Sequence, residues 1–330
     1  MGGLGRYVNG IVVIDKPEGI ASYDVVRRLK GLISGAKIGF LGTLDPLATG
    51  VLPLLLGEGT KLAPFLEAGL KVYEAGLCLG VVTDTQDREG QVVQSTELAA
   101  YDLSPAKIEE VIKQFRGRIM QRPPMYSALK QRGEPLYKLA RRGQEAERAL
   151  REVEIYELRL TKIDPPFLGL HVECSKGTYI RTLAHDIGQE LGCGAHVTAL
   201  RRTRSGPFSI DAALPLADVE VLLRQRRLKQ HLIPLAQAMG FLPAIEVTEA
   251  DALQISQGQA IPLVAQGAQT EAQAVRVVLS KGGGLVAVGM IHQEQGGFVI
   301  RPLRVFHDVF TKRPPYGKDK VLTMVNQGGR

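Results

Sequence analysis

The stretch Gly42–Leu52 reads Gly-Thr-Leu-Asp-Pro-Leu-Ala-Thr-Gly-Val-Leu and holds one carboxylate, Asp45, in a run that is otherwise uncharged and mostly small or apolar. No other ionisable side chain occurs between Lys37 and Glu58. Pro46 biases Asp45 toward an extended backbone and prevents a helix from continuing through this point. Such a stretch is interpreted either as an ordinary Asp-Pro turn or as a loop that holds a reactive carboxylate away from bulk water.

The composition is typical of a soluble globular protein. The chain has 330 residues, of which 45% are hydrophobic and 23% charged, enough for one large domain and one small one. The apolar run Val51–Leu56 is too short to span a membrane, and the N-terminal segment lacks the apolar core of a secretion signal. Three cysteines fit a reducing compartment without structural disulfides. We therefore expect a cytoplasmic protein without membrane association.

The net charge is +7, and the basic residues are concentrated in residues 122–151, residues 201–227 and the tail after Thr311. A basic surplus favours a polyanionic partner. The three segments are interpreted either as solvated faces or as phosphate contacts along a folded RNA, and the second segment then includes Arg201 and Arg202.

Apolar periodicity and capping residues predict the main elements. Ser22 is expected to cap a helix with an apolar face, and Ser104 to cap a second helix that starts at Pro105. The remaining patterns predict strands over residues 10–15, 72–80, 153–163 and 168–174, and a helix over residues 180–191.

The chain changes character around residue 237 and becomes rich in short strands. A short helix is expected after Thr248. Strands are expected over residues 275–280, 285–292 and 298–300, with a hairpin turn at the glycines 282–284. This pattern predicts a small β-rich unit.

Metal and nucleotide-cofactor motifs are not supported. Cys193 and His196 have the spacing of a ligand pair, but no second pair accompanies them and Cys174 belongs to an apolar alternation. The chain has no phosphate-binding Gly-x-x-x-x-Gly-Lys-Ser/Thr motif and no supported dinucleotide fingerprint. We expect no metal site and no cofactor.

Five motifs occur in a fixed order along the chain. They are Lys16-Pro17, Gly42–Leu62 (GTLDPLATGVLPLLLGEGTKL), Lys71-Val72-Tyr73, Pro124–Lys130 (PMYSALK) and Cys174–Arg181 (CSKGTYIR). With these motifs the chain resembles the bacterial tRNA pseudouridine synthase B family over nearly its whole length through Phe306. Residues 301–306 also resemble the end of a PUA-type RNA-binding domain.

The resemblance implies an α+β fold. Residues 1–238 are expected to form a pseudouridine synthase catalytic domain with a mixed, mostly antiparallel sheet flanked by helices. Residues 122–151 would form a basic insertion in this domain that grips RNA. Residues 239–310 are expected to form a small β-barrel of the PUA type, and residues 311–330 a disordered basic tail.

The resemblance also implies an activity. Members of this family isomerise one uridine in the T loop of tRNA, position 55, to pseudouridine without a guide RNA. Substrate and product contain the same atoms, so the reaction needs no redox cofactor, ATP or metal. The expected partner is therefore the T arm of tRNA, bound by a monomer that requires no protein partner.

The matching motifs imply roles for single residues. Asp45 is expected to be the nucleophile, and the guanidinium of Arg181 to keep it ionised. Tyr179 is expected to handle a proton at C5 or to hold the edge of the base. Tyr73 is expected to stack on the base and Leu200 to line its pocket. The sequence leaves open whether Asp45 attacks the sugar carbon C1′ or the ring carbon C6.

A second set of residues is expected to contact the RNA or to lie beside the active cleft. Phe40 stands where bacterial relatives commonly carry a histidine, and its ring can stack on a base but cannot donate a hydrogen bond. The full set is Lys16, Pro17, Phe40, Asp87, Tyr126, Lys130, Arg141, Arg142 and Lys176.

Three other functions share part of this pattern. A guide-RNA-dependent pseudouridine synthase would share the Asp45 motif, but the basic insertion after Tyr126 favours the stand-alone form. A non-catalytic chaperone for tRNA folding would require neither Asp45 nor Arg181. A glycosidase usually needs a second carboxyl group as its acid, and none accompanies Asp45 in the matching motifs.

Overall fold

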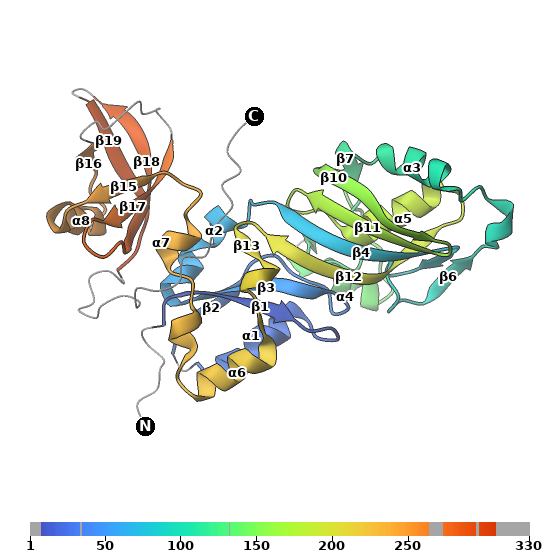
Figure 1. Cartoon of the computed structure of the whole chain (residues 1–330), viewed down its shortest axis with the longest axis horizontal. Coiled ribbons are helices and arrows are strands. Elements are labelled where there is room, and N and C mark those ends of the chain that lie inside the picture. Colours follow the sequence, from blue (N-terminus) through green and yellow to red (C-terminus); the bar gives the residue numbers. More distant parts are fainter. Residues whose placement is uncertain (1–7, 34, 132, 264–272, 295–296, 308–330) are drawn as a thin grey trace. The chain divides into compact units, whose positions relative to one another are not determined.

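The computed structural model describes residues 8–33, 35–131, 133–263, 273–294 and 297–307 (Figure 1). Within them the chain forms two compact units, the first from residues 12–221 and the second from residues 8–11 together with the described residues after 221. The expected domain limits at residues 238 and 310 stay a prediction. The tail expected to be disordered, residues 311–330, lies outside the described residues.

A ten-stranded mixed sheet is the frame of the first unit. Its strands are β1 (Gly10–Lys16), β2 (Ile38–Phe40), β3 (Thr49–Leu56), β4 (Lys71–Leu79), β7 (Gly117–Gln121), β10 (Arg151–Asp164), β11 (Phe167–Cys174), β12 (Ala195–Ser205), β13 (Phe208–Ser209) and β14 (Leu214–Pro215). The order is β14-β1-β3-β12-β4-β11-β10-β7, while β2 pairs with β3 and β13 with β12. The β1–β14 and β3–β12 pairs are parallel, and every pair from β12 to β7 is antiparallel. The predicted mixed, mostly antiparallel sheet is confirmed.

Helices accompany this sheet (Figure 1), and the chain also forms two small hairpin sheets. The helices are α1 (Ser22–Lys30), α2 (Ala63–Leu66), α3 (Pro105–Lys113), α4 (Leu136–Arg141), α5 (Ile180–Glu190) and α6 (Leu216–Arg224), with 3-10 turns at Gly57–Leu62, Leu98–Ala100 and Ile210–Ala212. The hairpins are β5 (Val81–Thr83) with β6 (Val92–Ser95), and β8 (Lys130–Gln131) with β9 (Glu134–Pro135). In the described part of the chain, no helix is long and apolar enough to cross a membrane.

The start of α1 differs from the prediction. Ala21 is the N-cap residue, and the carboxylate of Asp24 accepts a hydrogen bond from its backbone N–H at 3.3 Å. The prediction that Ser22 caps this helix was wrong because its hydroxyl bonds to Leu44 instead. By contrast, Ser104 caps α3 as predicted, since its side chain accepts from the N–H of Lys107. The expected apolar face of α1 is confirmed by the burial of Val25, Val26 and Leu29.

Alternation along the strands gives the large sheet a buried face and an open face. On β11, Leu168, Leu170, Val172 and Cys174 are buried, and the residues between them are partly exposed. Tyr73 of β4 lies directly opposite Val172, so it points to the same buried face. Helix α5 packs against β12 and β4. Tyr73 therefore lies on the buried face of the large sheet, with the core residues of β11.

The second unit contains a five-stranded sheet in the order β15-β17-β18-β19-β16. Its strands are β15 (Ala244–Val247), β16 (Ile261–Leu263), β17 (Ala274–Leu279), β18 (Leu285–Glu294) and β19 (Gly297–Val305), and its helices are α7 (Leu235–Ala238) and α8 (Glu249–Ser256), with a 3-10 turn at Leu228–His231. The sheet curls over a core that includes Ile255, Val277, Val286 and Ile300. This curled half-barrel is consistent with the predicted PUA-type domain.

Candidate active site

Asp45 and Arg181, 136 positions apart in the sequence, form a two-point ion pair. Nε of Arg181 donates to Oδ2 of Asp45 at 2.8 Å, and Nη2 donates to Oδ1 at 3.2 Å. Asp45 lies in the loop between β2 and β3, and Arg181 is the second residue of α5. The Arg181 side chain is 4% exposed, whereas that of Asp45 is 34% exposed. The guanidinium thus supports the carboxylate from the interior and leaves part of it open to a ligand.

Arg181 is itself fixed by two other segments. Nη1 donates to the carbonyl oxygen of Thr85 at 2.7 Å, and Nη2 donates to that of Tyr126 at 2.8 Å. A second carboxylate, Asp87, lies 3.4 Å from Nη1. A guanidinium presents its donors in a rigid planar fork, so these partners set its orientation as well as satisfy it. The structure therefore places two further predicted residues beside the Asp45–Arg181 pair. Asp87 contributes its carboxylate and Tyr126 its backbone carbonyl.

The loop that carries Asp87 is held against β12. The carboxylate of Asp87 accepts hydrogen bonds from the Thr85 hydroxyl at 2.6 Å and from the N–H of Glu89 at 3.0 Å. The backbone of the loop exchanges hydrogen bonds with Val197 of β12. This network aims both the carbonyl of Thr85 and the carboxylate of Asp87 at Arg181.

The backbone on both sides of Asp45 is tied to the segment between β1 and α1. Before Asp45, the hydroxyl of Ser22 accepts from the N–H of Leu44 at 2.8 Å and donates to its carbonyl at 3.0 Å. After Asp45, the carbonyl of Pro46 accepts from the N–H of Gly19 at 2.9 Å. The loop therefore has little freedom at the positions that decide where the Asp45 carboxylate lies.

Lys16 is buried and supports the same loop. Its ammonium group donates to the carbonyl oxygens of Pro17, Ile20 and Pro46 at 2.8, 2.7 and 3.2 Å. Burial lowers the pKa of Lys16 to about 8, while the negative charge of Asp45 acts in the opposite direction. Contact of Lys16 with RNA stays a prediction, as does that of Pro17, which is exposed.

Arg202 bridges the two ends of the Asp45 loop. Nε donates to the carbonyl of Val51 and Nη2 to that of Gly42, both at 2.8 Å. The interpretation of Arg202 as a phosphate contact is wrong, because its side chain is 1% exposed and its guanidinium lies under this loop. Gly50 has a φ of +99°, and a Cβ atom there would collide with the carbonyl oxygen of Arg202. The close approach of β3 to β12 therefore requires glycine at this position.

Tyr179 is held by a buried glutamine. Gln121, the last residue of β7, accepts from the N–H of Tyr179 at 2.8 Å and donates from Nε2 to its carbonyl at 3.0 Å. Tyr179 is the N-cap residue of α5, so this clamp also fixes the start of the helix that carries Arg181. Burial raises the pKa of the Tyr179 phenol, and the charge of Asp45 adds to the rise. The phenol consequently stays protonated and can donate a hydrogen bond at neutral pH.

Tyr73 and Leu200 are diagonal neighbours on β4 and β12. In the strand register Tyr73 lies opposite Arg202 and Leu200 opposite Ala75, so all four side chains share one face. Tyr73 is 8% exposed and Leu200 7%. Burial raises the pKa of the Tyr73 phenol; the Arg202 guanidinium opposes this rise and the charge of Asp45 adds to it. Tyr73 thus lies within electrostatic reach of Asp45.

Most charged side chains in the described part of the basic insertion are exposed. Within α4, Leu136 is buried. Arg142 pairs with Glu134 at 2.7 Å, and the guanidinium of Arg141 lies 5.8 Å from the centroid of the Tyr137 ring. The expected RNA contacts of this group stay predictions; Lys130, Arg141, Arg142 and Lys176 are exposed, and Phe40 is half-buried.

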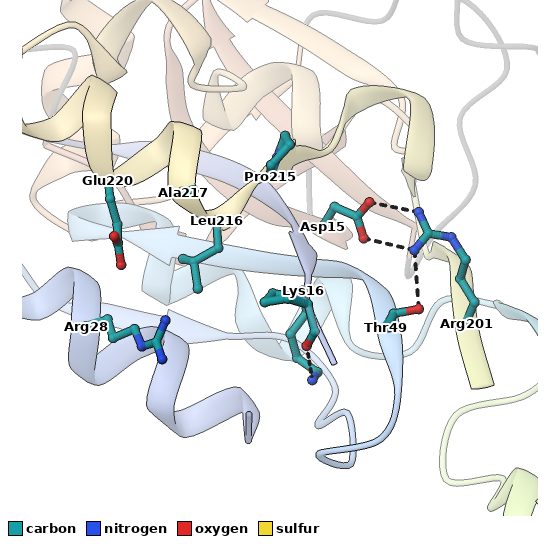
Figure 2. Close-up of a pocket in the computed structure, with 10 residues that line it drawn as sticks. Asp15, Lys16, Arg28, Thr49, Arg201, Pro215, Leu216, Ala217 and Glu220 are labelled. Atoms are coloured by element: carbon teal, nitrogen blue, oxygen red, sulfur yellow. Dashed lines mark hydrogen bonds and ion pairs between the residues drawn. The ribbon is translucent and has the colours of Figure 1, made fainter. Parts of the chain in front are cut away.

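A pocket of about 400 Å³ lies beside β1 and α6 (Figure 2). In its wall, Arg201 donates to both carboxylate oxygens of Asp15, at 2.8 and 3.1 Å, and to the hydroxyl of Thr49 at 3.3 Å. Pro215 and Leu216 add apolar surface. This pocket is distinct from the Asp45–Arg181 pair, because neither of those residues lines it.

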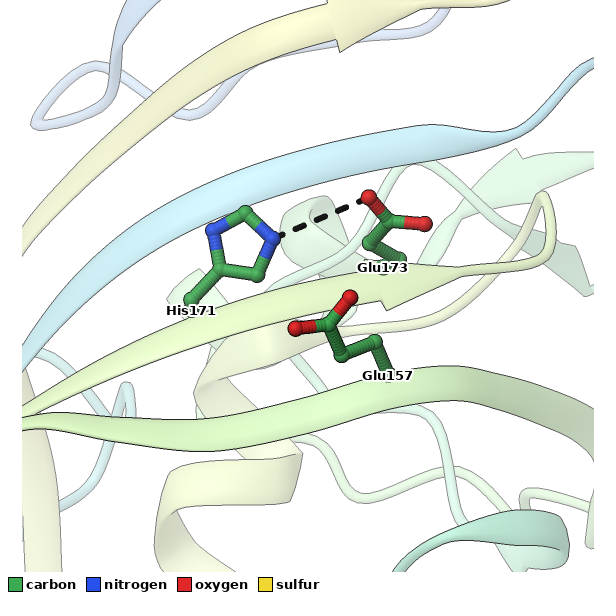
Figure 3. A group of neighbouring side chains, drawn as sticks. All are labelled: Glu157, His171 and Glu173. Carbon is green, nitrogen blue, oxygen red and sulfur yellow. Dashed lines mark ion pairs between the residues drawn. The ribbon is translucent and has the colours of Figure 1, made fainter. Parts of the chain in front are cut away.

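A group of side chains of the metal-ligating type lies across β10 and β11 (Figure 3). The donor atoms of Glu157, His171 and Glu173 lie within 4.8 Å of one another. Two of the groups already have partners, because Nδ1 of His171 lies 2.5 Å from a carboxylate oxygen of Glu74 and Glu157 pairs with Arg159 at 2.9 Å. We interpret the cluster as an ion-pair network on the open face of the sheet.

Sequence analysis missed one residue of this site and misread two others. Gln121 was not identified, Ser22 was predicted to cap a helix, and Arg202 was interpreted as part of either a solvated face or a phosphate-binding segment, neither of which fits its burial. A lone glutamine, serine or arginine has no spacing that marks it as a support for a distant loop. The local signals in the loop were Gly42 and Gly50, whose conformational freedom permits tight turns and the close approach of another chain segment.

Three family models match consecutive parts of the chain. The model described as "TruB family pseudouridylate synthase (N terminal domain)" matches residues 30–180. The model "tRNA pseudouridylate synthase B C-terminal domain" matches residues 181–239, and "Pseudouridine synthase II TruB, C-terminal" matches residues 243–306.

Curated relatives are similar over most of the chain. The tRNA pseudouridine synthase B of Geobacter sulfurreducens is 47% identical over 251 residues, which cover 76% of this chain and 82% of that protein. The protein of the same name from Syntrophotalea carbinolica is 41% identical over 309 residues, which cover 91% of this chain and 99% of that protein.

Two solved structures share the fold, with lower sequence identity to this chain than the curated relatives have. A chain of the "Cbf5-Nop10-Gar1 Complex" aligns with a TM-score of 0.69 at 28% identity, covering 91% of this chain and 85% of its own length. A chain of an "H/ACA RNP bound to a substrate RNA containing 2'-deoxyuridine" aligns with a TM-score of 0.67 at 27% identity, covering 90% of this chain and 84% of its own.

Proposed function

This chain belongs to the tRNA pseudouridine synthase B family, and we propose that it isomerises uridine 55 in the T loop of tRNA to pseudouridine without a guide RNA. The observation that carries the proposal is the two-point pair between Arg181 and Asp45, which presents a partly exposed carboxylate from a buried support. The names of the curated relatives support tRNA as the substrate.

The reaction breaks one bond to the base and forms another. The bond from N1 of uracil to C1′ of the ribose is broken, the base turns, and a bond from C5 to C1′ forms. The proton on C5 is lost and N1 gains one, so no atom is added or removed. The site must therefore supply a nucleophile, a surface for the base and a group that holds or moves a proton.

Asp45 supplies the nucleophile in this proposal. A carboxylate must be ionised to attack a carbon atom, and the guanidinium of Arg181 stabilises its negative charge through two hydrogen bonds. The buried Arg181 also prevents the carboxylate from turning toward the interior. One face of the carboxylate remains open for the nucleotide.

Tyr73 and Tyr179 handle the base. The target base must leave its stack, which costs a few kcal/mol, and stacking on an aromatic side chain recovers about 1–3 kcal/mol. Tyr73 offers the ring, supported by Leu200 on the neighbouring strand. Tyr179 offers a protonated phenol that holds a base edge or transfers a proton near C5.

The basic insertion supplies the remaining binding energy. Lys130, Arg141 and Arg142 are exposed, so phosphates can reach their charges, and at Arg142 a phosphate competes with Glu134. In this proposal the chain acts in the cytoplasm as a monomer and needs no protein partner to hold the T arm.

A guide-RNA-dependent reaction is the alternative suggested by the solved structures. Those chains are 27–28% identical to this one, whereas the curated tRNA pseudouridine synthase B proteins are 41–47% identical over most of its length. The higher identity supports the guide-independent activity.

The experiment is a conversion assay with a minimal substrate. The purified chain is incubated with an unmodified T-arm stem-loop, without guide RNA or other proteins, and pseudouridine is mapped along the RNA. We expect modification at position 55 only, and none in a stem-loop with cytidine at that position. Product that appears only after a guide RNA and partner proteins are added would refute the proposal.

A further inference from the structure

We propose that Ser22 is a positioning residue for Asp45, which fixes the backbone immediately before the carboxylate through both hydrogen-bonding groups of Leu44. This inference rests on the proposed function, because its readout is the rate of isomerisation. Ser22 does not contact the Asp45 carboxylate in this account; it acts through the loop that carries it.

One hydroxyl satisfies two buried backbone groups of a single residue. The Ser22 hydroxyl donates to the Leu44 carbonyl at 3.0 Å and accepts from the Leu44 N–H at 2.8 Å, across 22 positions of sequence. Ser22 is 1% exposed and Leu44 3%, so water cannot replace either bond without a local rearrangement. A hydroxyl has one donor and two acceptor lone pairs, which is what this arrangement uses.

The hydroxyl is free for this purpose because α1 is capped in another way. Ala21 occupies the N-cap position, and its N–H is satisfied by the carboxylate of Asp24. Ser22 is the first residue of a helix whose Val25 and Leu29 are buried in the core. The hydroxyl therefore connects the Asp45 loop to a rigid element of the fold.

The bonds from Ser22 complete a clamp on both neighbours of Asp45. Pro46 is held by the N–H of Gly19 and by Lys16, whereas Leu44 is held on both its polar groups by Ser22. With the backbone fixed on each side, only the two side-chain torsions of Asp45 remain, and Arg181 fixes these. Loss of the Ser22 hydroxyl would release the Leu44 side of the clamp and let the carboxylate move relative to the bound nucleotide.

The test compares Ser22→Ala with Ser104→Ala. Each serine lies at the start of a helix, and its hydroxyl accepts a hydrogen bond from a backbone N–H. Ser22 bonds to Leu44 in the Asp45 loop, whereas Ser104 bonds to Lys107 in its own helix, α3. Displacing a reacting group by about 1 Å costs roughly 10²-fold in rate. We expect Ser22→Ala to lower the single-turnover rate on the T-arm stem-loop about 10- to 100-fold while the Kd for RNA stays within about 2-fold.

Ser104→Ala is expected to keep the wild-type single-turnover rate, because it loses only a cap. Ser22→Cys keeps a γ atom that is larger than the hydroxyl oxygen and forms weaker hydrogen bonds, so its rate should lie between those of wild type and Ser22→Ala. It also supplies the same test if Ser22→Ala does not fold.

A folded Ser22→Ala or Ser22→Cys chain with the wild-type rate, when the wild type is active, would overturn this inference alone. An equal loss of rate in Ser104→Ala would also overturn it, because the effect would then be one of general stability. A wild-type chain that forms no pseudouridine would instead overturn the proposed function, and this inference with it.

Discussion

Replacing Arg181 by lysine keeps one positive charge near Asp45 but removes the planar fork of donors. The guanidinium contacts two oxygens of Asp45, the carbonyls of Thr85 and Tyr126, and the carboxylate of Asp87. A lysine ammonium is a single point and cannot reach all these groups from one position. We expect both the rate of isomerisation and the stability of the fold to fall.

The magnitude follows from the bonds that are lost. The carbonyls of Thr85 and Tyr126, two half-buried residues, lose their partners at roughly 1–3 kcal/mol each, so we expect the free energy of unfolding to fall by about 2–6 kcal/mol. The Asp45 carboxylate keeps at most one of its two hydrogen bonds to residue 181, so it can rotate about its side-chain torsions. A displacement of about 1 Å costs about 10²-fold, so the single-turnover rate should fall about 10²- to 10³-fold. RNA affinity should change by less than about 3-fold, because Arg181 is buried.

The assay uses saturating enzyme and a labelled T-arm stem-loop, with urea unfolding in parallel. The matched control is Arg201→Lys, because Arg201 also makes a two-point pair, with Asp15, but is 41% exposed in the wall of the pocket in Figure 2. The control should lose at most about 1 kcal/mol and keep its rate. An Arg181→Lys chain within about 3-fold of the wild-type rate would refute the reasoning, because charge without geometry would then suffice.

Three further predictions follow from other parts of the structure. Gln121→Leu removes both bonds to the backbone of Tyr179 and should lower the single-turnover rate by about 10-fold or more, with RNA binding unchanged; an unaltered rate would contradict this role. Burial raises the pKa of Asp186 from 3.8 to about 6, so the folded state binds the proton more tightly and stability falls as pH rises through this window. Asp186→Asn should therefore raise the urea midpoint at pH 7.5 and leave it unchanged below pH 3.8, whereas a gain independent of pH would count against burial as the cause. Joint replacement of Arg141 and Arg142 by alanine should lower the slope of log Kd against log salt by about 1–2 while the rate at saturation persists; an unchanged slope would show that these side chains do not contact phosphate.

Elements with a local signature could be predicted from the sequence. The apolar alternation of β11 and the serine cap of α3 depend on residues a few positions apart, and both are confirmed. The pairing of Asp45 with Arg181 is not local, since 136 positions separate them. It could be predicted only because two separate motifs resemble one family. The strand order explains why the residues meet: the Asp45 loop leads into β3, α5 leads into β12, and β3 and β12 are paired.

Ser22 and Arg202 show what local patterns leave undecided. A serine at the start of a helix can cap the helix or bond to a distant loop, and the sequence around Ser22 is compatible with both. Counting charges cannot separate a buried arginine from an exposed one, because the carbonyls that accept hydrogen bonds from Arg202 are 151 and 160 positions away. A backbone carbonyl has no side-chain signature, so the glycines of the loop indicate a close approach but not that Arg202 is the residue that approaches.

The central claim is that the Asp45 carboxylate, held by Arg181, attacks the target nucleotide of a tRNA T arm. Its most direct test is the single-turnover formation of pseudouridine by Asp45→Asn, measured beside its affinity for the same stem-loop. We predict a rate at least about 10³-fold below wild type with unchanged affinity, because an amide of the same shape is not a nucleophile. Near-wild-type product formation by the folded Asp45→Asn chain would contradict the claim.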